Sequence, residues 1–183
     1  MYIAEQLKKK NVAEYLLYMW QVEDTLRAYG LDVEKMAAEY IPQFGLDAEK
    51  SEALKGWYES LIQMMREEGV TEKGHLQVNK NIIILLNDLH AQLLKSSKHP
   101  FYSAAYYKAL PFIVELRSKS TESQDKGEIE NCFDALYGTM LLKARKKEIS
   151  AETATAINNI AKFIGMLSDY YQKDKAGELK IES

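Results

Sequence analysis

Apolar side chains recur every three or four residues along almost the whole chain, and this period constrains the fold more than any other feature. An α-helix brings positions i, i+3, i+4 and i+7 to one face, whereas a half-buried strand requires strict alternation of apolar and polar residues. No segment of this chain sustains that alternation. The periodicity therefore predicts an all-α protein.

Capping residues, glycines and prolines divide the periodic pattern into six or seven helices that follow a short N-terminal lead. Asn11, Asp32, Asp47, Thr71 and Ser150 are typical N-cap residues, and Gly30 and Gly69 are typical residues after a helix end. The lead is predicted over residues 2–10, and the helices over 11–29, 32–40, 48–68, 72–96, 100–118, 127–147 and 150–173.

The sequence also predicts the position of one helix and the shape of another. Apolar residues occur all round the 72–96 helix, so we expect it at the centre of the protein, covered on several sides. Pro111 lies inside the 100–118 helix, where its ring and its missing N–H are expected to kink or split the helix. The connection at 118–126 is the most polar in the chain, and residues 174–183 are expected to fray.

The length of the chain suits one domain. A chain of 183 residues, 46% of them hydrophobic, can bury an adequate core without a disulfide or a metal. Short connections favour antiparallel neighbours. We therefore predict a single domain over residues 1–183, folded as an antiparallel helical bundle.

Charge and hydropathy exclude several classes of partner. The net charge is −3 and both signs are mixed along the chain, so the basic face that nucleic acid requires is missing. A helix-turn-helix over residues 143–173 would have only one basic residue in its recognition segment. The longest apolar runs, 82–86 and 109–114, are far shorter than the about 18 residues of a membrane span, and the N-terminus lacks the apolar core of a signal peptide. These features predict a cytoplasmic protein that binds neither nucleic acid nor a membrane.

Metal and cofactor chemistry also lack a sequence signal. Ferritin-like sites need two Glu-x-x-His pairs and two further glutamates, whereas this chain has one pair, Glu72 to His75. It has no phosphate-binding glycine loop and no Gly-x-Ser-x-Gly elbow. Cys132, the only cysteine, lies in mid-helix and is expected to be a small buried residue. We predict no metal, no cofactor and no catalytic residue.

The first candidate site is on the 11–29 helix. Glu23 falls near the centre of the apolar stripe, and a carboxylate in that position is either paired or functional. Arg27 follows Glu23 by four residues and Asp24 by three, a favourable spacing for helical ion pairs. The expected structure is a Glu23–Arg27 pair at a helix interface, and the alternative is a polar spot in a groove that receives a small ligand.

A second group of candidates is on the 72–96 and 100–118 helices. His90 lies near an apolar stripe, so we expect a core histidine bonded to a neighbouring group, with a general base or a ligand donor as the alternative. Tyr102 and Tyr106 share a helix face, and Tyr107 is offset toward Pro111. Packing is the expected role of these rings, although tyrosines also suit ligand pockets and interfaces.

The segment from Ile3 to Arg27, IAEQLKKKNVAEYLLYMWQVEDTLR, resembles a family of uncharacterised bacterial proteins from Bacteroidetes, the domain of unknown function DUF4924. Its most specific part is Asn11 to Asp24, and the resemblance covers essentially the whole chain. It implies a cytoplasmic bacterial protein of about this size. It assigns no activity, cofactor or site residue.

Two functions remain open from the sequence. Amphipathic helices, many aromatic residues and the lack of catalytic motifs favour a non-enzymatic helical module that forms a homodimer or docks a protein partner. The alternative is a small-molecule binding protein or enzyme with a polar pocket between helices near Glu23, Arg27, His90 and Tyr107. The ligand-binding candidates are Glu23, Asp24, Arg27, His90, Tyr106 and Tyr107.

Overall fold

The computed structural model describes residues 1–118 and 125–181, and within them it is all-helical. The prediction of an all-α, bundle-like fold is confirmed, but the number of helices is slightly higher than predicted because the N-terminal lead forms a regular helix of its own. The described elements are α1 (Tyr2–Lys10), α2 (Val12–Ala28), α3 (Val33–Glu39), the 3-10 helix η1 (Ile41–Phe44), α4 (Ala48–Glu67), α5 (Gln77–Lys95), α6 (Pro100–Ser118), α8 (Glu128–Ala144) and α9 (Ala151–Lys175).

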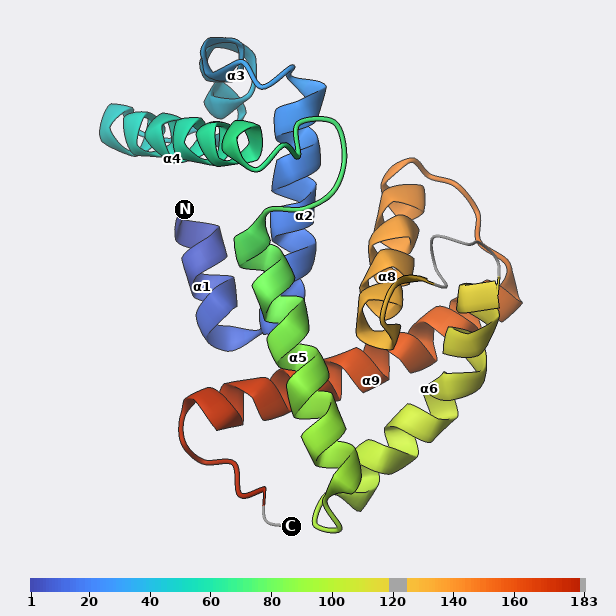
Figure 1. The fold of residues 1–183 in the computed structure, drawn as a ribbon. Helices are drawn as coiled ribbons and strands as arrows, with labels where there is room; N and C mark the ends of the chain where they lie inside the picture. Colours follow the sequence, from blue (N-terminus) through green and yellow to red (C-terminus); the bar gives the residue numbers. More distant parts are fainter. Residues whose placement is uncertain (119–124, 182–183) are drawn as a thin grey trace.

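The bundle is organised around α9, which packs against α2, α5, α6 and α8 and runs across α5 (Figure 1). Its buried face includes Ile160, Phe163, Ile164 and Leu167. The helix expected at 72–96 also packs against four others, since α5 contacts α2, α6, α8 and α9, but it is not covered all round. One face of α5 is buried in the bundle, but Val78, Ile84 and Leu85 are exposed on the other side. Apolar residues all round a helix therefore did not mean that it was covered all round.

A second group of helices lies at the end of α2 that is remote from α9 (Figure 1). There α4 packs against α2, α3 and η1. The buried residues of this part, such as Met36, Tyr58 and Met65, join those of the bundle in one continuous hydrophobic cluster. The long helix α2 thus contributes to both parts of the core.

Four of the predicted N-caps, Asn11, Asp32, Asp47 and Ser150, are confirmed, whereas Thr71 is wrong because α5 begins after Leu76. Asn11 separates α1 from α2, and its side-chain oxygen accepts hydrogen bonds from the N–H groups of Ala13 and Glu14. Ser168 of α9 donates to the same oxygen over 2.8 Å. Asp32, Asp47 and Ser150 cap α3, α4 and α9 in the same way.

Helix α5 begins at Gln77, five residues later than predicted, because its cap comes from other parts of the chain. The first N–H groups of a helix have no partner within the helix. The N–H of Leu76 donates to Glu23 over 3.0 Å, and the N–H of Gln77 donates to Glu68 over 2.6 Å. Two carboxylates therefore lie at the positive end of the α5 dipole, a position that stabilises negative charge.

Pro111 does not split α6, which runs without interruption from Pro100 to Ser118. Pro111 and Tyr107, whose carbonyl loses its helical partner, both lie on the exposed side of α6. A carbonyl on the solvent-facing side of a helix can be satisfied by water, which is consistent with a helix that continues through the proline. Residues 119–124 of the predicted polar connection lie outside the described residues, and α9 extends to Lys175, slightly farther than predicted. None of the helices within the described ranges has the length and apolarity to cross a membrane.

Candidate functional site

A fully buried carboxylate, that of Glu23, holds together the polar groups between α2 and the start of α5. One of its oxygens accepts hydrogen bonds from the Leu76 N–H and from the side-chain amide of Asn79, over 3.0 and 2.7 Å. The other oxygen lies 2.6 Å from Nδ1 of His75. The sequence predicted a paired carboxylate here, and the structure shows that its partners lie more than fifty positions away in the chain.

The expected Glu23–Arg27 ion pair is wrong. Arg27 instead binds Asp24, with 2.8 Å between Nη1 and Oδ1. Its other terminal nitrogen donates to the carbonyl oxygens of Val70 and Gly74. Arg27 therefore points away from Glu23 and holds the loop between α4 and α5 against the end of α2.

Asp24 links α2 to α8. Its second oxygen accepts a 2.7 Å hydrogen bond from the hydroxyl of Tyr137. Burial, together with this bond to a carboxylate, raises the pKa of Tyr137 well above its usual range. Asp24 and Arg27 are thus engaged with α8 and with the α4–α5 loop, and both have structural roles.

Glu23 also fixes the polarity of its two side-chain partners. An ionised carboxylate only accepts hydrogen bonds, so Asn79 must turn its NH2 group toward Glu23 and its Oδ1 away. For the same reason His75 carries a proton on Nδ1 when it binds the carboxylate. In the neutral imidazole, Nε2 is then the acceptor. Asn79 therefore presents an acceptor on the side opposite Glu23, and His75 does so when its ring is neutral.

These groups lie beside a cavity of about 210 Å³. His75 stacks on Trp20, with ring centroids 4.0 Å apart and an interplanar angle of 12°. Trp20 in turn makes edge contacts with Phe133 and Tyr137 of α8. The lining residues come from α2, α5, α8 and the turn before α5, and they are Trp20, His75, Asn79, Lys80, Ile83, Ile84, Asn87 and Glu130.

Two residues that line the cavity, Trp20 and Asn79, each have one buried side-chain atom without a partner. Nε1 of Trp20, a donor, and Oδ1 of Asn79, an acceptor, have no hydrogen-bond partner among the described residues. A buried polar group of this kind costs about 1–3 kcal/mol. Buried polar groups are nearly always satisfied, so an unpaired donor and an unpaired acceptor on one cavity require an explanation.

The remaining predicted candidates lie in a different cluster. His90 is buried, its Nδ1 lies 2.6 Å from the Tyr102 hydroxyl, and its ring contacts Tyr106 and Phe163. Burial lowers the pKa of His90, which favours the neutral ring. The expectation of a core histidine bonded to a neighbour is confirmed.

Tyr106 and Tyr107, the two tyrosine candidates on α6, differ in their surroundings. The Tyr106 hydroxyl donates to Glu128 of α8 over 2.8 Å. Tyr107 is 63% exposed, and its ring lies against that of Tyr106. The predicted candidates therefore form two separate groups. Glu23, Asp24 and Arg27 lie around the start of α5, whereas His90 and Tyr106 lie between α5, α6 and α9.

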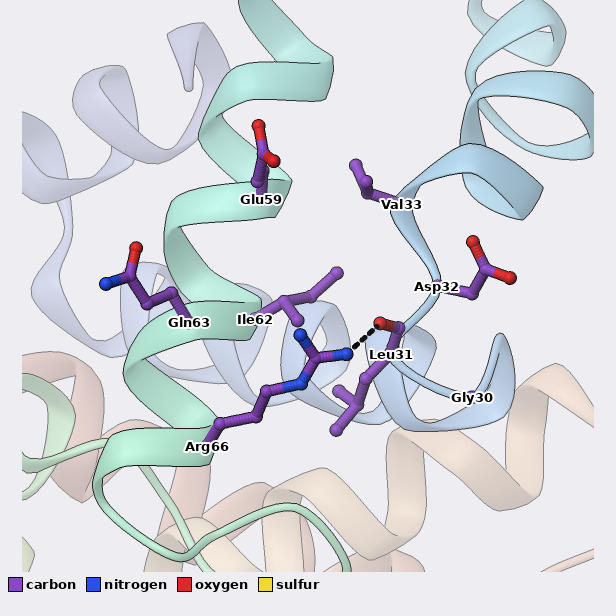
Figure 2. A pocket seen from close by; sticks show the side chains of 8 residues that line it. All are labelled: Gly30, Leu31, Asp32, Val33, Glu59, Ile62, Gln63 and Arg66. Carbon is purple, nitrogen blue, oxygen red and sulfur yellow. Dashed lines mark hydrogen bonds between the residues drawn. The ribbon is translucent and has the colours of Figure 1, made fainter.

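A second hollow lies where the turn after α2 meets α4, and its polar groups are engaged in holding that turn. Figure 2 shows Arg66 of α4 reaching the carbonyl oxygen of Leu31 over 3.0 Å. Asp32, on the same rim, caps α3 through the N–H groups of Glu34 and Lys35. Gly30 and Leu31 both have positive φ angles, so the arginine stabilises an unusual backbone.

Sequence reasoning missed the two residues that complete the cavity, His75 and Asn79. His75 was considered only for a metal site, and no group of three or more His, Cys, Asp or Glu side chains within the described residues is arranged to hold a metal ion. Asn79 precedes the buried Ile82 and Ile83 by three and four residues. An amide in register with an apolar stripe was the signal that could have indicated it.

Comparison with known proteins identifies the family but no function. The model of the domain of unknown function DUF4924 matches residues 1–178, so the chain belongs to this family, as the resemblance in its first helices predicted. Neither the curated proteins nor the solved structures yield a match.

Proposed function

We propose that this member of the DUF4924 family binds a small polar molecule in the cavity between α2, α5 and α8. The observation that carries the proposal is that Trp20 and Asn79, which both line this cavity, each have a buried side-chain atom without a partner, Nε1 of Trp20 and Oδ1 of Asn79. A ligand that offers them an acceptor and a donor removes the cost of leaving both unpaired. The proposal retains the alternative that the sequence left open, a polar pocket near Glu23. The residues proposed to line that pocket are now the ones that lie together in the structure.

The arrangement behind the cavity supports a preorganised site. Glu23 is fully buried, so the orientations of His75 and Asn79 are fixed before any ligand arrives. Groups that are already oriented lose little entropy on binding. The stacking of His75 on Trp20 fixes the indole as well.

The two tryptophans of the chain provide a direct test. Trp20 lines the cavity and Trp57 lies on α4, so the indole N–H signals in a ¹H–¹⁵N NMR spectrum report on the site and on a control position in one sample. We expect members of a panel of neutral, anionic, cationic and zwitterionic small molecules to shift the Trp20 signal in a saturable way and to leave the Trp57 signal in place. Trp20→Phe assigns the signals, and it should still fold because the lost N–H has no protein partner.

Ordered water is the competing explanation for the two unpaired atoms, since a polar cavity of this size can hold it. A high-resolution crystal structure distinguishes the two. The proposal fails if no compound in the panel shifts the Trp20 signal and the crystal shows only water against Trp20 Nε1 and Asn79 Oδ1.

Self-association is a second proposed function, and it rests on a different surface. Tyr2, Ile3 and Phe44 are each 43% exposed or more, and they line an apolar groove of about 260 Å³ between α1, η1 and α4. A twofold interface uses the same patch on both subunits. A patch that combines exposed apolar side chains with a groove for them can bind its own copy.

Light scattering coupled to size-exclusion chromatography tests this second proposal. We expect a dimer, and we expect Ile3→Asp to convert it to a monomer because the new charge would have to be buried in the interface. Val114→Asp is the control, because Val114 is as exposed as Ile3 but lies on α6. A monomeric wild-type protein at high micromolar concentration would count against self-association.

A further inference from the structure

We infer that the ligand of the Trp20–Asn79 cavity is a small zwitterion that carries one ammonium group and one carboxylate, as a free amino acid does. This inference rests on the proposed function, because it assigns a chemical class to the molecule bound at that site.

Two opposite charges face this cavity from different helices. Lys80 comes from α5 and Glu130 from α8, and both line the cavity. Neither side chain forms an ion pair with another residue in the part of the chain that the structure describes. An uncompensated charge of each sign attracts a ligand that carries both signs.

The two unpaired buried atoms likewise comprise one donor, Nε1 of Trp20, and one acceptor, Oδ1 of Asn79. A carboxylate accepts hydrogen bonds, and the cavity offers it the N–H of Trp20 and the ammonium of Lys80. An ammonium group donates hydrogen bonds, and the cavity offers it Oδ1 of Asn79 and the carboxylate of Glu130. Each half of a zwitterion therefore meets one buried neutral group and one charged group.

The acceptors have additional negative charge behind them. Glu23 lies directly behind Asn79 and His75, and it is completely buried. Its field adds to that of Glu130, so a purely anionic ligand is disfavoured and an ammonium group is favoured. Lys80 and Trp20 then account for a carboxylate on the same molecule.

The size of the cavity limits the ligand. At about 210 Å³ it is smaller than the roughly 300–1,000 Å³ of pockets that hold drug-sized molecules. Its apolar wall, formed by Ile83 and Ile84, leaves room for a short aliphatic or small polar side chain. Nucleotides and large aromatic compounds are too big for this space.

The test compares molecules that differ by one charged group. L-alanine, propionate and ethylamine form a matched set, because propionate lacks the ammonium group of alanine and ethylamine lacks its carboxylate. Titrating each into the full-length protein and following the Trp20 indole signal gives three dissociation constants. We expect L-alanine, or one of glycine, L-serine and L-threonine in its place, to bind at least about tenfold more tightly than either fragment, since a charged hydrogen bond contributes about 1.5–3 kcal/mol.

Two variants assign the charges. Lys80→Met should weaken binding of the zwitterion several-fold and leave ethylamine unaffected, whereas Glu130→Gln should weaken the zwitterion and leave propionate unaffected. Asn81→Met is the control, because Asn81 is an exposed residue of α5 that does not line the cavity. Equal affinity for alanine and one of its fragments, or unchanged binding in both charge variants, would overturn the inference.

Failure of this inference is distinguishable from failure of the proposed function. If neutral or singly charged compounds shift the Trp20 signal and zwitterions do not, the cavity is a binding site but the ligand class is wrong. If no compound shifts it and the crystal shows only water, the binding site itself is refuted.

Discussion

Replacing Glu23 by alanine tests the central structural argument, because this one carboxylate holds three donors from another part of the chain. Alanine leaves the Leu76 N–H, the Asn79 amide and the His75 ring without their acceptor in a buried setting. It also removes the negative charge at the N-terminus of α5. The start of α5 should therefore loosen together with the α4–α5 loop.

The size of the effect follows from the number and burial of these bonds. Removing one partner of a buried charged network costs about 3–5 kcal/mol, because the groups left behind stay desolvated. Glu23→Gln should cost only about 1–2 kcal/mol. Its carbonyl can still accept from Leu76 and Asn79, and its NH2 group can donate to His75 if the ring proton moves to Nε2. We therefore expect the two variants to differ by about 1–4 kcal/mol.

Urea unfolding followed by circular dichroism measures these differences through the midpoint and the slope of the transition. Gln21→Ala is the control on the exposed side of the same helix, where substitutions usually stay within about 0.5 kcal/mol. A Glu23→Ala protein as stable as Gln21→Ala, or two Glu23 variants of equal stability, would refute the view that this carboxylate organises the site.

Three further outcomes follow from other contacts. Tyr137→Phe loses the bond to Asp24 and should cost about 1 kcal/mol in urea unfolding, whereas Tyr107→Phe, on the exposed side of α6, should cost nothing measurable. Burial lowers the pKa of His90, so near its ordinary value of about 6.5 the unfolded chain takes up a proton that the folded protein does not. Stability should fall as the pH drops from about 7.5 to 5, and His90→Gln should flatten this part of the curve; an unchanged slope would contradict the assignment. Burial also raises the pKa of Cys132, so a thiol-reactive disulfide should modify it at the rate of unfolding, and immediate labelling of the native protein would show that it is accessible.

Much of the fold was predictable because local signals and the fold agree. Periodicity gave the helices, and Asn11, Asp32, Asp47 and Ser150 cap them as expected. The start of α5 was not predictable, since its capping carboxylates, Glu23 and Glu68, belong to other helices. Whether Pro111 would split its helix or leave it continuous was also not predictable, because periodicity does not report on how the freed carbonyl is satisfied.

The candidate site was only partly predictable. A carboxylate in the middle of an apolar stripe indicated Glu23, because burial of a charge requires partners. The partner expected from helical spacing, Arg27, was wrong. Helical spacing favoured a pair between Glu23 and Arg27. In the folded chain, Glu23 instead binds three donors, and Arg27 binds the carbonyl oxygens of Val70 and Gly74.

By itself, the sequence determined the all-α class, the family and the presence of one buried carboxylate on α2. These depend on spacing and polarity along a single helix. Only the tertiary structure decided that α9 is central, that His75 and Asn79 are the partners of Glu23, and that Trp20 and Asn79, each with one unpaired buried atom, line the same cavity. Such contacts join residues more than fifty positions apart, and their energies depend on which groups are desolvated together. No local pattern contains that information.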